Sequence, residues 1–145
     1  MKSKFIIIGV VAIFLLSLVS CSSGSSGASI SVQNVTDCDA FMKNNHISSE
    51  AEVGVDGVLT VGLCSNPTTG FEWTELAEIG DVLVVEQLDH EFTPPAAGTT
   101  GAPGKDTWTF KALKKGTTTI SMEYSRPWEG GEKAEWTYVL TLVVK

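Results

Sequence analysis

The sequence predicts an all-β fold, an antiparallel β-sandwich of about seven strands. From about residue 51 onward, short segments alternate apolar and polar side chains with a period of two, which is the period of a half-buried strand. Turn signals such as Asp56-Gly57 and Lys115-Gly116 separate these segments. No segment shows the period of an amphipathic helix. Two sheets packed face to face therefore fit the pattern best.

The expected strands follow one another along the second two thirds of the chain. We expect them at 51–55, 58–64, 71–76, 81–92, 107–113, 117–125 and 134–145. The Asp-Gly pair favours a hairpin between the first two strands. Alternation predicts which side chains face the core: Phe71, Trp73, Trp108, Phe110, Ala112, Ile120, Met122, Tyr124, Trp136, Tyr138, Leu140 and Leu142.

The first twenty residues are predicted to be a signal peptide. A basic start precedes a fifteen-residue apolar run at 5–19, which suits a signal peptide and is short for a membrane span. The small residues before Cys21 resemble the lipobox of prokaryotic lipoproteins. This resemblance implies a lipidated Cys21 and a place in the cell envelope, anchored to the membrane and facing outside the cytoplasm. The alternative is an uncleaved anchor helix.

Between the signal peptide and the strands, the chain is polar. Residues 22–30 are rich in Ser and Gly, which is typical of a flexible tether, and residues 31–49 give no clear assignment. We therefore divide the chain into a signal peptide (1–20), a tether with a polar lead-in (21–49) and one domain (50–145). The chain has a net charge of −7, and removal of two lysines with the signal peptide gives −9. An acidic chain without a basic stripe argues against a nucleic-acid partner.

The three cysteines form an odd set. If Cys21 carries lipid, Cys38 and Cys64 remain, and an exported protein can oxidise them to a disulfide. Cys64 lies on the face of its strand opposite to Leu59, Val61 and Leu63, so it is expected to point away from the core, where an upstream segment can cross it. We predict this disulfide.

Three long loops separate the strands, at 65–70, 93–106 and 126–134. Two strands lie between each loop and the next, so an up-and-down arrangement brings all three loops to one end of the sandwich. This is how immunoglobulin-like sandwiches present their binding loops.

Each loop has its own chemistry. In NPTTGF, Pro67 fixes its own φ, Gly70 can take a positive φ and Asn66 can bond its own backbone, so the loop is stiff and uncharged. The central loop is rich in Gly and Thr, and taken alone it resembles a slack surface loop. In RPWE, Arg126 and Trp128 are of the types most often found at interface hot spots. Alternatively, Trp128 tucks into the sandwich and Arg126 pairs with Glu129.

The motifs NPTTGF, GAPG before an aromatic strand, and YSRPWE, in this order, resemble the chagasin family of cysteine-protease inhibitors over about residues 50–145. The resemblance implies an immunoglobulin-like domain that inhibits papain-like cysteine proteases reversibly, without covalent reaction. Its three loops, here 66–71, 99–105 and 126–129, would fill the active-site cleft as a wedge. Where the family's central motif is Gly-x-Gly-Gly, this chain has Pro103 at the third position.

The resemblance also implies a role for each loop. The first loop would lie across the catalytic cysteine, the third on one side of the cleft and the central loop on the other. The residues expected to contact the protease are Asn66, Pro67, Thr68, Thr69, Gly70, Phe71, Gly101, Ala102, Pro103, Gly104, Arg126, Pro127 and Trp128.

Two other classes of function remain open from the sequence. An enzyme would need Cys64 as a nucleophile with His46 or His90, but both histidines lie in polar stretches without an evident partner. A non-inhibitory surface module, such as an adhesin or a carbohydrate binder, could use the tryptophans as stacking platforms. We expect no enzyme activity, no cofactor and no metal, since no CxxC or HxxxH spacing is present.

Overall fold

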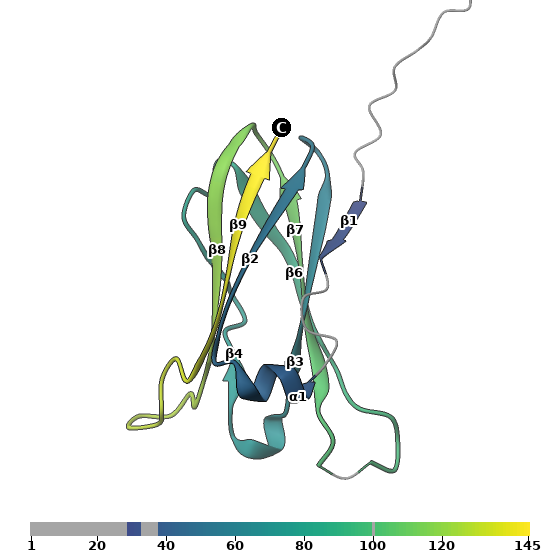
Figure 1. Ribbon diagram of the computed structural model, residues 1–145, viewed down its shortest axis with the longest axis vertical. Coiled ribbons are helices and arrows are strands. Elements are labelled where there is room, and N and C mark those ends of the chain that lie inside the picture. The colour runs from purple at the N-terminus through teal and green to yellow at the C-terminus, as the bar shows by residue number, and fades with distance from the viewer. Residues whose placement is uncertain (1–28, 33–37, 100) are drawn as a thin grey trace, which may run out of the picture.

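The fold is a sandwich of two β-sheets that face each other (Figure 1). The computed structural model of the protein describes residues 29–32, 38–99 and 101–145. One sheet has the strand order β1-β3-β7-β6 and the other the order β2-β9-β8-β4, with β5 also pairing with β8. The elements are β1 (Ser29–Val32), α1 (Cys38–Lys43), β2 (His46–Val53), β3 (Val58–Ser65), the 3₁₀ helix η1 (Pro67–Thr69), β4 (Glu72–Trp73), β5 (Glu78–Ile79), β6 (Val85–Thr93), β7 (Gly104–Ala112), β8 (Gly116–Ser125) and β9 (Trp136–Val144). The predicted all-β sandwich is confirmed.

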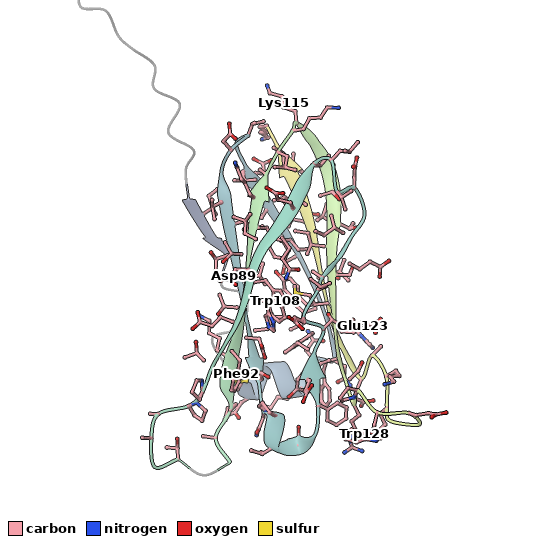
Figure 2. All side chains as sticks on the ribbon, turned by 180° about the vertical axis from the view of Figure 1, so that it is seen from behind. Asp89, Phe92, Trp108, Lys115, Glu123 and Trp128 are labelled. Carbon is pink, nitrogen blue, oxygen red and sulfur yellow. A yellow bond between two sulfur atoms is a disulfide. The ribbon has the colours of Figure 1, made fainter. Side chains whose placement is uncertain are left out.

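The core lies between the two sheets. Trp108, at its centre in Figure 2, Phe110 on the same strand and Tyr138 on β9 are completely buried. The alternation predicted the inward face correctly, although Trp136 at the start of β9 is only partly buried. Burial of each large apolar side chain stabilises the fold by about 1.5–3 kcal/mol. The sandwich is therefore a firm support for the loops at its ends.

The strand pairing differs from the prediction. The expected hairpin at Asp56-Gly57 is wrong, because β2 pairs in parallel with β9, and β3 pairs with β7 in the opposite sheet. The turn is tight, with Asp56 at a φ of 63°, but it carries the chain from one sheet to the other. A second parallel pair joins β1 to β3. An alternating segment predicts a strand but does not specify its partner, which is why the simple antiparallel hairpin failed.

Two predicted strands are shorter in the structure. Of the strand expected at 71–76, only β4 is formed. The strand expected at 81–92 begins at Val85, because residues 81–84 form a turn. In this turn the Asp81 carboxylate accepts a hydrogen bond from the Leu83 backbone N–H (2.9 Å).

The segment before residue 50 contains more structure than the predicted tether and lead-in (21–49). β1, α1 and the first residues of β2 lie within it. β1 and β2 are held by backbone pairing with β3 and β9, which requires little apolar sequence. The expected signal peptide (1–20) and Cys21 lie outside the described residues. In the ranges 29–32, 38–99 and 101–145, no helix is both long and apolar enough to cross a membrane.

Candidate functional site

Three long loops leave the same end of the sandwich, the lower end in Figure 1. We call them loop 1 (66–71), loop 2 (94–103) and loop 3 (126–135). Strand register supports this placement, because Ser65 of β3 pairs with Gly104 of β7 and Glu72 of β4 pairs with Ser125 of β8. The tight turn at Lys115 lies at the opposite end (Figure 2). Counting strands predicted this grouping, because successive long strands reverse direction even when they belong to different sheets.

Loop 1 is one turn of 3₁₀ helix closed at both ends. The Asn66 side-chain oxygen accepts hydrogen bonds from the backbone N–H of Thr68 (3.3 Å) and from its hydroxyl (2.6 Å). Pro67 stands at the first helical position, where its fixed φ suits the turn. Gly70 ends the turn with a φ of 79°, and its N–H donates to the Pro67 carbonyl (3.0 Å). Short-range bonds therefore fix the shape of the tip.

Asn66 also joins loop 1 to its surroundings. Its backbone N–H donates to the Tyr124 hydroxyl on β8 (2.8 Å). Its side-chain amide donates to the Gly101 carbonyl in loop 2 (3.1 Å). One asparagine thus caps the turn, ties it to the core and connects two of the three loops.

Loop 3 packs against the other side of loop 1. The Arg126 guanidinium lies over the Phe71 ring, 4.6 Å from its centroid, and 5.7 Å from that of Trp128. Its Nη1 is paired with the Glu132 carboxylate (3.0 Å), and not with Glu129 as the sequence alternative had it. Trp128 does not tuck into the core, since 51% of its surface remains exposed. A methyl group on Gly70 would lie 2.8 Å from the Trp128 ring, so the indole rests directly on loop 1.

Loop 3 is also closed within itself. The backbone N–H of Arg126 donates to the backbone carbonyl of Glu132 (2.8 Å), and the Lys133 ammonium donates to the backbone carbonyls of Arg126 and Trp128. These bonds hold the arginine and the tryptophan in one position. The side chains best suited to a binding hot spot are therefore preorganised.

Among its described residues, loop 2 has fewer internal hydrogen bonds than the other two loops. Gly98 and Gly101 both have a positive φ, and the Ala102 N–H donates to the Thr99 carbonyl (3.3 Å). Gly104 is already the first residue of β7, where a Cβ would lie 2.5 Å from the Thr93 carbonyl oxygen. The close approach of β6 therefore requires a glycine at this position.

The predicted contact residues fall into three groups by burial. Phe71 is buried, with 7% of its surface exposed, so its side chain faces the core, as the alternation predicts, and its expected contact with a protease stays a prediction. It stacks on Tyr124 (5.5 Å between centroids) and meets the edge of Trp136 (5.4 Å), and thereby supports Arg126 from below. The half-buried residues are Asn66, Gly70, Ala102, Gly104 and Arg126, and the exposed ones are Pro67, Thr68, Thr69, Gly101, Pro103, Pro127 and Trp128.

A fourth element lies at this end, and sequence reasoning missed it. The predicted disulfide between Cys38 and Cys64 is present, with 5.5 Å between the Cα atoms, and it fastens α1 to the end of β3. Cys64 is 5% exposed. After α1, the Asn45 carbonyl accepts from the Thr137 N–H (2.7 Å), and the Asn45 side chain donates to the Glu135 carbonyl (3.2 Å). The only sequence signal for α1 was the cysteine that anchors it.

The structure argues against thiol catalysis. Cys64 is bonded to Cys38 and cannot act as a nucleophile. His90 is paired with Asp106 (2.6 Å) and stacks on Trp108, while His46 is bonded to the Thr137 hydroxyl (2.9 Å). Within the described ranges, no group of three or more potential ligands comes together to hold a metal ion.

Comparison with known proteins gives the family. Residues 52–142, more than half of the chain, match the sequence model of the chagasin family of peptidase inhibitors, I42. The chain belongs to the chagasin family. Among curated proteins, it is 30% identical over 114 residues to Amoebiasin-2 of Entamoeba histolytica, covering 74% of this chain and 92% of the relative. It is also 30% identical over 90 residues to Chagasin of Trypanosoma cruzi, covering 59% of this chain and 79% of that protein.

Solved structures of chagasin-type inhibitors share the fold. The crystal structure of a cysteine protease inhibitor from Entamoeba histolytica superimposes with a TM-score of 0.56 at 25% identity, covering 70% of this chain and 95% of the other. The structure of PbICP-C in complex with falcipain-2 gives the same TM-score at 17% identity, covering 82% of this chain and 100% of the other, and is evidence for the fold alone. The predicted immunoglobulin-like sandwich is confirmed. The predictions that the protein is a cysteine-protease inhibitor and that it is not an enzyme are confirmed as well.

Proposed function

We propose that the protein inhibits papain-like cysteine proteases by a reversible, non-covalent mechanism in which loops 1, 2 and 3 fill the active-site cleft together. One observation carries this proposal. Loop 1 is stiff, uncharged at its tip and held from both sides, by Asn66 to loop 2 and by Trp128 and Arg126 of loop 3. A preformed convex edge loses little conformational entropy on binding.

The loops divide the work by position. Thr68 and Thr69, exposed at the tip, would lie over the catalytic cysteine. Trp128 and Pro127 would pack against one wall of the cleft, with Arg126 held beneath them. Gly101 and the residues up to Gly104 would face the other wall. The inhibitor–protease pairs of this kind bury about 800 Å² on each partner.

The shape of loop 1 also explains why a protease would not cleave it. Residues Pro67–Thr69 form a 3₁₀ turn, whereas an extended strand is the form that a protease grips by backbone pairing. The Thr69 N–H and hydroxyl are engaged with the Asn66 carbonyl (3.1 and 2.7 Å), so the turn resists being drawn out. The nucleophile of a covalent step would be the protease's own cysteine, and the 3₁₀ turn does not present a loop carbonyl to it in the extended form of a substrate.

The alternative of an adhesin or carbohydrate binder gains little support. Trp73 and Trp108 are buried and Trp136 is partly buried, so they provide no open stacking platform. Trp128 is exposed, but it rests on Gly70 and is part of the three-loop edge.

The direct test is titration of residues 22–145, which include every residue that the structure describes, into papain. We expect tight, reversible inhibition with the inhibitor recovered intact. Thr69→Arg should raise Ki at least about tenfold, because it places a long charged side chain at the centre of the contact, and Trp128→Ala should do so by removing an exposed anchor. Neither should lower the melting temperature by more than a few degrees. Absence of inhibition at micromolar concentrations would reject the proposed function.

We further propose that the protein is a lipoprotein of the cell envelope, anchored through Cys21 and facing outside the cytoplasm. The support is the basic start, the fifteen-residue apolar run and the small residues before Cys21. Labelled palmitate should enter the wild-type protein in a bacterial host and be absent from Cys21→Ala. Equal labelling of the two proteins would contradict the anchor.

A further inference from the structure

An apolar pocket lies beside the three loops, between α1 and loop 1. Its volume is about 340 Å³. Asp39 of α1 lines one wall, Thr69 of loop 1 and Pro103 of loop 2 line the others, and Phe71 and Trp136 lie among the remaining lining residues. The pocket therefore opens among residues that we assign to the protease contact, and it has one wall that the three loops do not supply.

The position of that wall is fixed by covalent and hydrogen bonds. Cys38, the first residue of α1, is bonded to Cys64, which is two residues before Asn66. The chain leaving α1 is bonded at Asn45 to the start of β9. Both ends of the segment are thus held at the loop end of the sandwich, where Figure 1 shows α1 beside η1 and β3. α1 lies outside residues 52–142, the part of the chain that matches the family.

We propose that α1 is a fourth contact element of this inhibitor and that the pocket receives an apolar side chain from the rim of the protease's active-site cleft. The proposal rests on the proposed function. A protease seated on Thr69 and Pro103 would lie next to the pocket, because those two residues line it. The lining surface is mostly apolar, which favours an apolar occupant over a charged side chain, because the charged side chain would lose hydration on entry.

The size of the pocket suits a single large side chain. Ligand pockets in proteins range from about 300 to 1,000 Å³, and this one is at the lower end. An anchor side chain buried in such a pocket is the usual form of an interface hot spot. The pocket would thus favour proteases with a large apolar residue at that rim position over those with a small or charged one.

Two tryptophan substitutions on α1 give a matched test. Asp39→Trp places an indole at the pocket, whereas Lys43→Trp adds the same side chain at an exposed position of the same helix that does not line it. Measured as Ki for papain with residues 22–145, Asp39→Trp should weaken inhibition at least about tenfold, the effect of losing one anchor. Lys43→Trp should change Ki less than about threefold.

The outcomes separate this proposal from the proposed function. If wild type and Lys43→Trp inhibit and Asp39→Trp inhibits equally well or better, the fourth contact is rejected while the three-loop mechanism stands. If wild type itself does not inhibit, the proposed function fails. A second measurement does not depend on folding of the variant: amide hydrogen exchange of residues 38–43 in the wild-type protein should slow on saturation with papain. Unchanged exchange there, with loop 1 protected, would also reject the contact.

Discussion

At the scale of single residues, Gly70 has two constraints at once. Its φ of 79° is one that side chains other than glycine adopt at a cost of about 1–2 kcal/mol. Its missing Cβ also leaves room for the Trp128 ring, which a methyl group would approach to 2.8 Å. The same glycine therefore ends the turn of loop 1 and leaves room for the exposed Trp128 of loop 3.

Gly98 offers a control for Gly70, because it lies in loop 2 before the expected contact residues 101–104. It too has a positive φ, 91°, but a Cβ there would meet nothing within 4 Å. Gly70→Ala and Gly98→Ala should lower the free energy of unfolding by similar amounts, about 1–2 kcal/mol, because both introduce the same backbone strain. Only Gly70→Ala should also raise Ki for papain, roughly tenfold or more, since it displaces Trp128. Equal Ki values for the two variants would show that the contact with Trp128 is unimportant.

At the scale of secondary-structure elements, the sequence predicted the buried face of each strand better than it predicted which strands pair. The alternation at 107–113 and 117–125 predicted the buried side of β7 and β8, because burial on one face imposes a period of two. Pairing depends on contacts between distant segments, so the hairpin expected at Asp56-Gly57 could not be distinguished from a crossing between sheets. The apolar pattern of the sequence did not predict β1 or α1, because β1 is held by backbone hydrogen bonds and α1 by one disulfide.

The candidate site, like the fold, could be predicted only in part. The motifs and the strand count placed loops 1, 2 and 3 at one end. They did not show that Glu132 and not Glu129 pairs with Arg126, or that α1 joins the loops. Each of these depends on a tertiary contact that leaves no local pattern.

The disulfide that holds α1 gives a prediction at this scale. The cysteines are 26 residues apart, so the chain-entropy model gives a stabilisation of about 3–4 kcal/mol. The double variant Cys38→Ala/Cys64→Ala should lose about that free energy of unfolding in denaturant titration. The wild-type protein should approach the same value after reduction, which serves as the control. A loss below about 1 kcal/mol would mean that the unfolded chain is already restricted in this region.

At the scale of the whole molecule, the residues that form the core and the residues proposed to bind a protease lie in different parts of the fold. The sheets bury the aromatic side chains of the core, and the residues proposed to contact a protease stand on loops at one end, so the loops can vary without disturbing the core. The charges follow a different division. No lysine or arginine occurs between Lys43 and Lys105, whereas ten carboxylates lie in this interval: Glu50, Glu52, Asp56, Glu72, Glu75, Glu78, Asp81, Glu86, Asp89 and Glu91.

This charge distribution should govern the rate of association more than the stability of the complex. The chain without its first twenty residues has a net charge of −9, while the tip of loop 1 is uncharged. Long-range attraction accelerates encounter with a basic partner, and salt screens it, whereas the short-range contacts of the loops set the dissociation rate. For a papain-like protease of positive net charge, stopped-flow measurements should show the association rate constant falling about tenfold or more between roughly 10 and 150 mM ionic strength. The dissociation rate constant should change much less. A papain-like protease of negative net charge is the control. Its association should be slower and should accelerate as the ionic strength rises. The same salt dependence for both proteases would show that the net charge of this inhibitor does not steer the encounter.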